Sequence, residues 1–229
     1  MLKRSAAKTG DPWENYRRVK VSYDGEWSNL TTRLQPVLTD PGFRKRSVET
    51  YQPRSGQVLQ VHTGLQGTKQ VMRQRPKTEV FVNGPATKKS EVIAAAALVA
   101  DAYTVFLFGP SWLVGQGRDL TLLEARLIDG ERCDLVAGKL SPGIGSPADD
   151  HFIAWIGRES GLMRRFQFSL NGLESTRGAD VDVTLSEHWK AADGSVWPGH
   201  FVERIQRPIC IKAHDWRMTG LWLDGVKAR

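Results

Sequence analysis

The clearest alternation of apolar and polar residues along the chain runs from Asp149 to Leu170. Such alternation is typical of a half-buried β-strand, and it occurs twice here, on either side of a turn that contains Gly161. Glycine readily adopts the positive φ that hairpin turns need. The apolar positions of the two strands are Phe152, Ala154 and Ile156, and then Phe166, Phe168 and Leu170. We therefore predict an antiparallel hairpin whose first strand, with Trp155 on its opposite face, is covered on both sides.

The same pattern predicts about ten to twelve strands over the whole chain. The further strands are expected at Arg17–Tyr23, Ser47–Gln52, Gln57–Thr63, Thr68–Arg75, Thr78–Val82, Thr121–Ile128, Arg132–Leu140, Asp180–Trp189, Val196–Gln206 and Ile209–Leu223. Asp-Gly pairs at 24–25, 129–130 and 193–194 favour hairpin turns. The segment Leu34–Phe43 contains two prolines and a glycine, and we expect it to be a loop.

One substantial helix is predicted at Lys88–Tyr103, because its alanines favour helix and Glu91 suits a first turn. Its packing stripe is Ile93, Ala96, Ala97 and Ala100. We expect a very apolar strand, Tyr103–Phe108, to follow, closed by Gly109 and Pro110. Small residues on the helix leave room between it and a sheet. The predicted fold is therefore mainly β, a curled antiparallel sheet or unclosed half-barrel whose apolar interior is covered by one helix.

Length and composition suit a single domain over residues 1–229, with residues 1–12 as a flexible tail. No run reaches the ~18 apolar residues of a membrane span, and Val92–Ala100 is too short. The first residues, Met1–Lys8, have no apolar core after their charges, so no signal peptide is expected in this chain.

The net charge of +7 favours acidic partners such as phospholipid head groups or other polyanions. Three stretches are locally basic, Lys3–Arg18, Arg44–Arg46 and Gln70–Lys77, and we expect each to be solvated surface. A basic scaffold that binds polyanions on its outer surface is one functional hypothesis. No nucleic acid partner is expected, and the chain is expected to be a monomer.

Cysteine and histidine define the possible chemistry. Cys133 and Cys210 either pair in an oxidising compartment or stay as two buried free thiols. Their neighbours lack the ligand spacing of a zinc site, and no cofactor motif is found. The histidines are expected to be surface or hydrogen-bonded residues. An enzymatic alternative, a hydrolase or metal enzyme, would have to assemble its site from distant strands. Its candidate residues are His151, His200 and His214 with Asp149, Asp150 and Asp215.

The order of elements from Arg17 to Leu223 resembles the periplasmic lipoprotein-carrier (LolA/LolB-like) superfamily, in particular its uncharacterised outer-membrane lipoprotein-sorting relatives. The resemblance is carried by Phe152–Phe168 and by the Asp-Gly-Ser-Val-Trp-Pro turn at 193–198. It implies an unclosed β-barrel around an apolar cavity, a location in the cell envelope, and binding of acyl chains.

The first functional hypothesis is thus a non-enzymatic protein that holds a lipid or acyl chain, with a membrane surface or a lipoprotein as further partners. Aromatic residues usually build cores, but on a curled sheet with one helix some would face a pocket. The candidate ligand-binding residues are Trp27, Trp155, Phe166, Phe168 and Trp197. We expect Trp155, Phe166 and Phe168 to line a cavity beneath the Lys88–Tyr103 helix.

Overall fold

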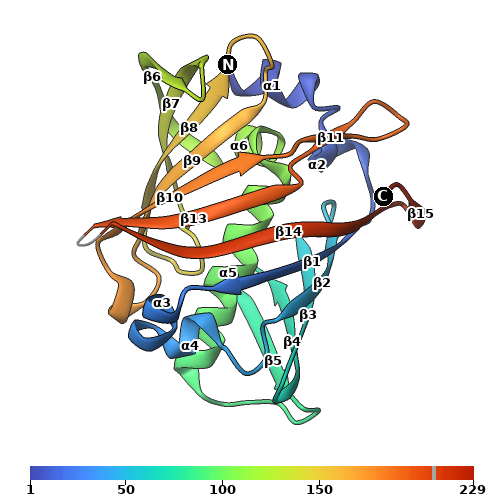
Figure 1. The fold of residues 1–229 in the computed structure, drawn as a ribbon, viewed down its shortest axis with the longest axis vertical. Helices are drawn as coiled ribbons and strands as arrows, with labels where there is room; N and C mark the ends of the chain where they lie inside the picture. Colours follow the sequence, from blue (N-terminus) through green and yellow to red (C-terminus); the bar gives the residue numbers. More distant parts are fainter. Residues whose placement is uncertain (208–209) are drawn as a thin grey trace.

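Thirteen strands form one antiparallel sheet in a computed structural model, which describes residues 1–207 and 210–229. The strand order is β5-β4-β3-β2-β1-β14-β13-β10-β9-β8-β7-β6, with β15 paired to β14 and a separate β11–β12 pair. The strands are β1 Val19–Trp27, β2 Arg46–Gln52, β3 Gln57–Gly64, β4 Gly67–Gln74, β5 Lys77–Val82, β6 Gly117–Ile128, β7 Glu131–Leu140, β8 Asp150–Gly157, β9 Met163–Leu170, β10 Ala179–Ser186, β11 Trp189–Lys190, β12 Val196–Trp197, β13 His200–Arg207, β14 Ile211–Leu223 and β15 Val226–Lys227. Figure 1 shows β1 and β14 crossing the middle of the sheet.

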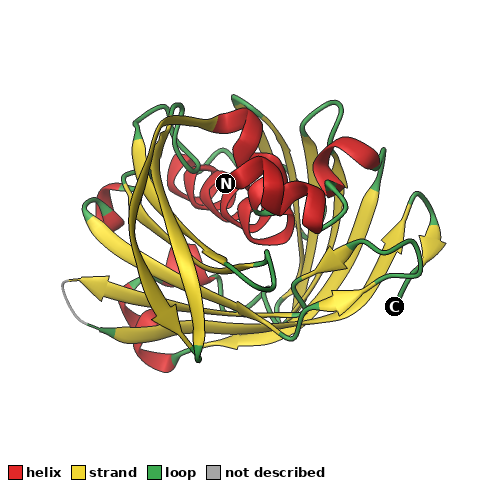
Figure 2. Ribbon diagram, turned by 90° about the horizontal axis from the view of Figure 1, so that it is seen from above, coloured by secondary structure: helices red, strands yellow, loops and turns green. Residues whose placement is uncertain are grey.

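Within the described residues, six α-helices and one short 3-10 helix accompany the sheet. They are α1 Leu2–Lys8, α2 Pro12–Asn15, α3 Asn29–Leu34, α4 Pro36–Thr39, α5 Ser90–Phe108, α6 Pro110–Gln116 and η1 Glu174–Thr176. The sheet curls without closing, and α5 lies in its concave side (Figure 2). The predicted fold class, a curled antiparallel half-barrel with one substantial helix, is confirmed.

The hairpin predicted from the alternating pattern is present as β8 and β9. Phe152 pairs with Phe168 and Ala154 with Phe166, so all four side chains face the concave side. Gly161 has φ of 72° in the connecting turn, which is the conformation that favours glycine there. The turn between β6 and β7 likewise uses Gly130, with φ of 81°.

The strand predicted at Tyr103–Phe108 is wrong, because α5 continues as far as Phe108. Residues 95 to 108 of α5 are all buried, so its C-terminal half shows no polar stripe. A short run that is apolar all round does not distinguish a buried helix from a buried strand. By length and composition α5 could also cross a membrane, contrary to the expectation that no run reaches the length of a membrane span. In the structure 78% of its most apolar window is buried within the protein, as in a core helix.

Three other expectations are corrected by the structure. Gly25 lies within β1 and makes no hairpin. The expected loop Leu34–Phe43 contains α4, whose Leu38 is buried. Residues 1–12 are not a tail, because they contain α1, which buries Leu2. The expected start of the last strand at Ile209 lies outside the described residues.

Candidate functional site

The five candidate aromatic residues occupy three different environments. Trp155 lies on the convex side of the sheet, packed with Ile128, Cys133 and Leu135. Its indole N–H donates to Gln167 Oε1 at 2.8 Å, and the Arg165 guanidinium lies 4.8 Å from its ring. Trp155 therefore faces away from the concave interior.

Phe166 and Phe168 do face the concave interior, where they are buried in the main core. Their ring centroids lie 5.4 Å apart, and Phe106 of α5 lies 6.0 Å from Phe168. Trp197 is fully buried, 5.9 Å from Phe108, and donates its indole N–H to Ser195 at 2.9 Å. Side chains of α5 thus pack directly against these aromatic residues.

Trp27, the fifth candidate, is half-buried and borders a groove of about 540 Å³. We call this the Trp27 groove. It is lined by Gly25, Glu26, Trp27, Asn29, Thr32, Pro41, Arg44, Lys45, Arg46, Thr63, Gly64 and Leu65. These residues come from the end of β1, helix α3, the segment after α4, and the turn between β3 and β4. Its volume falls within the range typical of small-molecule sites.

Local sequence explains how Trp27 is positioned. A Cβ on Gly25 would lie 2.3 Å from the carbonyl oxygen of Asp215 and 2.8 Å from the Trp216 ring, so glycine lets β1 approach β14 closely. Ser28 then caps α3 by accepting a hydrogen bond from the Thr31 N–H at 3.2 Å. The strand therefore ends at Trp27, whose ring lies 4.4 Å from that of His214.

Arg44 forms the inner wall of the Trp27 groove and is only 4% exposed. Its guanidinium donates to the Leu38 carbonyl oxygen at 3.3 Å and to the Tyr103 hydroxyl. It also lies 4.9 Å from the ring of Trp27 and 5.5 Å from the ring of Trp216. The expectation that Arg44–Arg46 is solvated surface is therefore wrong for Arg44.

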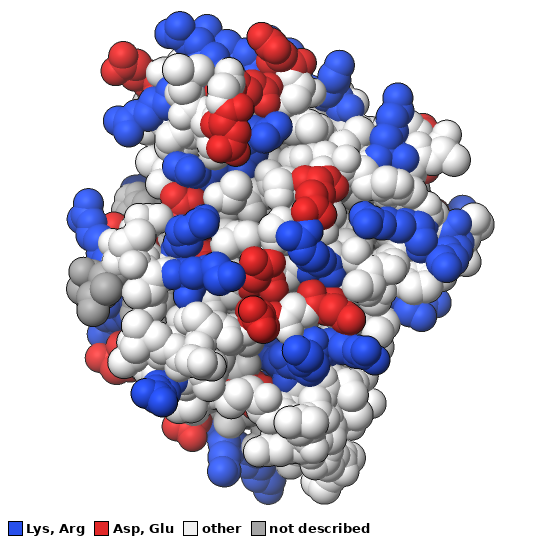
Figure 3. Space-filling model, viewed as in Figure 1, with Lys and Arg blue, Asp and Glu red and all other residues white. Residues whose placement is uncertain are grey.

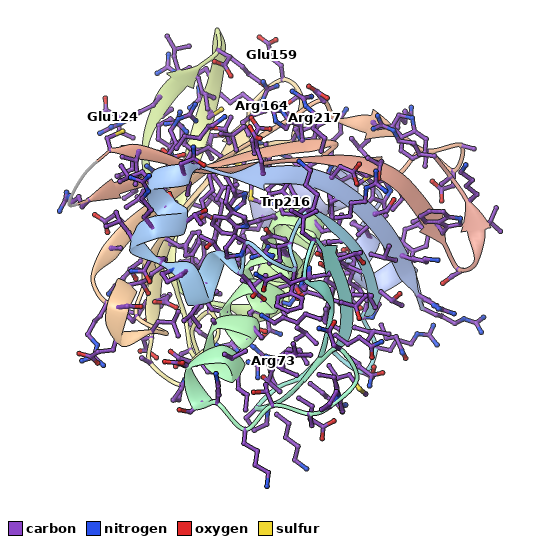
Figure 4. The ribbon with its side chains drawn as sticks, turned by 60° about the horizontal axis from the view of Figure 1, so that its bottom comes forward. Arg73, Glu124, Glu159, Arg164, Trp216 and Arg217 are labelled. Atoms are coloured by element: carbon purple, nitrogen blue, oxygen red, sulfur yellow. The ribbon has the colours of Figure 1, made fainter. Side chains whose placement is uncertain are left out.

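Sequence reasoning missed Arg44 because a basic run of three residues is usually surface. Nothing in the local sequence Pro-Gly-Phe-Arg-Lys-Arg separates Arg44 from its exposed neighbours Lys45 and Arg46. Arg73, within the basic stretch Gln70–Lys77, is likewise buried, at 6% exposure. Figure 4 shows Arg73 beside α5, and Trp216 between α5 and the sheet.

A buried polar cluster lies behind the Trp27 groove, between the sheet and α5. Burial raises the pKa of Glu49, which accepts hydrogen bonds from Ser47 and Tyr51. Burial lowers the pKa of His62, and the nearby charge of Arg44 lowers it further. His214 is hydrogen-bonded to Glu203 at 3.0 Å. Several ionisable groups are therefore buried among aromatic rings in this part of the interior.

Several polar atoms around Arg44 find no hydrogen-bond partner among residues 1–207 and 210–229. They are Arg44 Nε, Trp27 Nε1, Trp216 Nε1, His62 Nδ1 and His214 Nδ1. Buried polar groups are normally hydrogen-bonded, and an unsatisfied one costs about 1–3 kcal/mol. Five such atoms therefore lie near the Trp27 groove, while others, such as Arg165 Nε and Asp182 Oδ1, lie on the convex side.

The residues of the enzymatic alternative are brought together only in part. His200 Nε2 lies 2.7 Å from Asp215 Oδ1, and Ser186 Oγ lies 3.1 Å from His200 Nδ1. These residues sit on the paired strands β10, β13 and β14, and none of them lines the Trp27 groove. His151 is exposed, while Asp150 is buried and accepts a hydrogen bond from the Ile144 N–H at 2.7 Å. No group of three His, Cys, Asp or Glu side chains suited to a metal occurs among the described residues.

Cys133 and Cys210 are both free cysteines in the structure. Cys133 is buried in the convex-side cluster with Trp155, as expected for a buried thiol. Cys210 is exposed, so the expectation of two buried thiols holds for Cys133 alone. Burial raises the pKa of the Cys133 thiol to about 11, which leaves it unreactive at neutral pH.

The convex side of the sheet has a larger and more polar groove, of about 880 Å³. Its charged residues pair with one another, as Arg165 does with Asp182 at 3.4 Å. Over the face drawn in Figure 3, acidic and basic side chains are interspersed. The mixed charge on this face gives no support to the polyanion-scaffold hypothesis.

Comparison with known proteins identifies the fold. No protein-family model matches the chain, and no curated protein matches it in sequence. A DUF1329 family protein from Desulfovibrio piger is 11% identical, with a TM-score of 0.56 over 97% of this chain and 91% of that one. A LolA superfamily protein from Nitrosomonas europaea is 10% identical, with a TM-score of 0.52 over 96% of this chain and 93% of that one. The chain therefore has the LolA-type fold predicted from its sequence, shared at the level of structure.

Proposed function

We propose that this protein is a non-enzymatic binding protein of the cell envelope that holds a lipid or acyl chain, with the Trp27 groove as the place where the chain binds. The observation that carries the proposal is this groove, which combines apolar wall residues with an open mouth in a LolA-type half-barrel. Trp27, Pro41 and Leu65 supply the apolar surface, and Leu65 is fully exposed.

The energetics suit an acyl ligand. Each buried methylene contributes about 0.8 kcal/mol, so a chain with six to eight buried methylenes would gain about 5–6 kcal/mol before the entropy of association is subtracted. Such a ligand needs no special chemistry beyond a groove of suitable shape. Partners that carry acyl chains, such as a lipoprotein or a membrane surface, follow from the same chemistry.

The placement of the other candidates refines the site. Phe166, Phe168 and Trp197 are packed against α5, so we propose that they form the rigid floor on which the groove is built. Trp155 stabilises the convex side of β8. Within this proposal, direct contact with the acyl chain falls to Trp27.

The test is titration with a fluorescent fatty acid. Trp27→Ala should weaken binding by at least about tenfold, since burial of a large apolar side chain is worth about 1.5–3 kcal/mol. Trp222→Ala is the matched control, because Trp222 is also half-buried but lies on β14, away from the groove, under the Lys20 ammonium at 4.9 Å. Equal loss in both variants, or no uptake by the wild type, would contradict the proposal.

A further inference from the structure

The charges around the Trp27 groove are unequal. Arg44, Lys45 and Arg46 line it, and Glu26 is its only carboxylate among the described residues. Arg46 is paired with Asp24 at 3.6 Å. Arg44 and Lys45 form no ion pair within 4.0 Å in the part of the chain that the structure describes. The groove therefore keeps an excess of positive charge beside its apolar wall.

Arg44 lacks a carboxylate partner among the described residues, whereas other arginines of the concave interior have one. Arg73 and Arg75 share the carboxylate of Asp101, at 2.7 Å and 3.0 Å. A buried charge without a partner is strongly unfavourable, and proteins normally pair such groups. The rings of Trp27, Tyr103 and Trp216 stabilise the Arg44 guanidinium in part.

The nearest buried carboxyl groups form their hydrogen bonds with residues other than Arg44. Glu49 is hydrogen-bonded to Ser47 and Tyr51; burial raises its pKa, and the charge of Arg44 acts in the opposite direction. Glu203 is bonded to His214. Arg44 Nε and Trp27 Nε1 remain without acceptors among the described residues. Two N–H groups without acceptors and a cation thus belong to residues that line a groove open to solvent.

We propose that the ligand of the Trp27 groove is an amphiphile whose anionic head group is a carboxylate or a phosphate. Arg44 and Lys45 bind this head group, and the acyl chain lies against Trp27 and Leu65. This inference rests on the proposed function and adds the chemistry of the head group. The planar guanidinium presents parallel N–H donors that match both carboxylate and phosphate oxygens. Lys45 is exposed at the rim and adds an ammonium group there.

The experiment compares three ligands that have the same twelve-carbon chain, with the anions below their critical micelle concentrations and the alcohol below its solubility limit. They are dodecanoate, dodecyl phosphate and the neutral dodecanol, measured by calorimetry with the full chain at pH 7.5. The wild type should bind at least one anion about tenfold more tightly than dodecanol, as one charge-assisted hydrogen bond would give. Tighter binding of dodecyl phosphate identifies a phosphate head group, and tighter binding of dodecanoate identifies a carboxylate.

Arg44→Met should reduce this preference to about twofold while leaving the affinity for dodecanol unchanged. Lys45→Met, at an exposed position, should reduce it partially without affecting folding. Arg54→Met, in the exposed turn between β2 and β3, is the matched control and should change nothing. If Arg44→Met does not fold, the test rests on Lys45→Met and on a second measurement at 0.5 M salt, where the Debye length is about 4 Å. At that salt concentration the protein should lose anion binding but keep dodecanol binding.

The outcomes separate the two proposals. If dodecanol binds as tightly as both anions, the head-group inference is wrong and the acyl-binding proposal stands. If the preference for anions survives in both Arg44→Met and Lys45→Met, these residues do not bind the head group. If none of the three ligands binds, the acyl-binding proposal itself fails.

Discussion

Neighbouring residues in this protein often serve opposite faces of the sheet. Trp155 packs on the convex side, while Ala154 and Ile156 belong to the concave core. The alternating pattern predicted this separation, since successive side chains of a strand point to opposite faces. Grouping Trp155 with Phe166 and Phe168 around one cavity went against that pattern. Figure 4 shows the same alternation at Trp216 and Arg217, which point to opposite sides of β14.

The burial of Arg44 could not be predicted from the residues next to it in the sequence. Its position depends on contacts with Leu38, Tyr103 and Trp216, which come from three separate parts of the chain. Local composition around Arg44 carries no information about these partners. The Trp27 groove is thus a product of tertiary structure, and only its aromatic residue was identified in advance.

A residue-scale prediction concerns His188. Burial lowers its pKa from 6.5 to about 4, and the nearby charge of Arg164 acts in the same direction. Between these values the unfolded chain binds a proton that the folded protein does not, so this contribution to stability is present above pH 6.5 and is lost as the pH falls towards 4. Relative to His188→Gln, the free energy of unfolding of the wild type should fall by about 3 kcal/mol between pH 7 and pH 4.

The measurement is urea unfolding of both proteins at several pH values. Taking the difference removes the effect of the buried carboxyl groups, whose raised pKa values act in the opposite direction. A difference that does not change between pH 7 and pH 4 would show that His188 takes up its proton freely in the folded state.

At the scale of elements, the strands were the most predictable part. Alternation and glycine turns placed the β3, β4, β7, β8 and β9 strands to within a few residues. The Asp-Gly pair at 24–25 misled, because the same glycine that permits a turn also permits close approach of two strands, which is its use beside Trp216. Sequence alone does not separate these two uses of glycine.

Helices were less predictable, for two different reasons. The second half of α5 is apolar on every side, so it lacks the stripe by which a surface helix is recognised. Helix α1 is short and rich in charge, and its role depends on distant contacts, including the hydrogen bond from Ser5 to the Gly161 carbonyl oxygen. Composition therefore suggested a flexible tail where the structure has a packed helix.

The packing of α1 gives an element-scale prediction. Leu2 is 4% exposed and belongs to the main core. Leu2→Ala should lower the free energy of unfolding by about 2–3 kcal/mol, in the range of buried leucine truncations. Leu34→Ala, at the end of α3 with 57% exposure, should change it by less than about 0.5 kcal/mol. Chemical denaturation of both variants provides the test, and equal small effects would mean that α1 does not hold its place in solution.

For the whole molecule, sequence predicted the class and the curl of the sheet but not how its two ends are joined. The β4 and β5 strands lie at one end of the sheet, and β6, β7 and β8 lie at the other. No strand pairing joins these ends within the described residues. Side chains make the connection instead, across the concave side and beside α5.

Asp101 of α5 is the centre of this connection. It binds Arg73 of β4 and Arg75 of the β4–β5 turn, and it accepts a hydrogen bond from the Gly145 N–H at 2.9 Å. Gly145 belongs to the loop between β7 and β8, and a Cβ there would lie 2.3 Å from Leu98 Cα, so the loop lies directly on α5. Arg75 also donates to the Gly143 carbonyl oxygen of the same loop. One carboxylate thus holds both ends of the sheet against the helix.

Asp101→Asn keeps the shape of this side chain but removes its charge, and leaves Arg73 and Arg75 without a counter-charge. Removing one partner of a buried pair costs about 3–5 kcal/mol, so we expect a loss of that size in urea unfolding. Asp24→Asn is the control, because Asp24 is 49% exposed and its pair with Arg46 at 3.6 Å should contribute less than about 1 kcal/mol.

In Asp101→Asn, hydrogen exchange should also quicken in both β4 and the loop between β7 and β8, because the two ends of the sheet are released together. Faster exchange in β4 alone would mean that Asp101 stabilises its own end of the sheet and does not join the two.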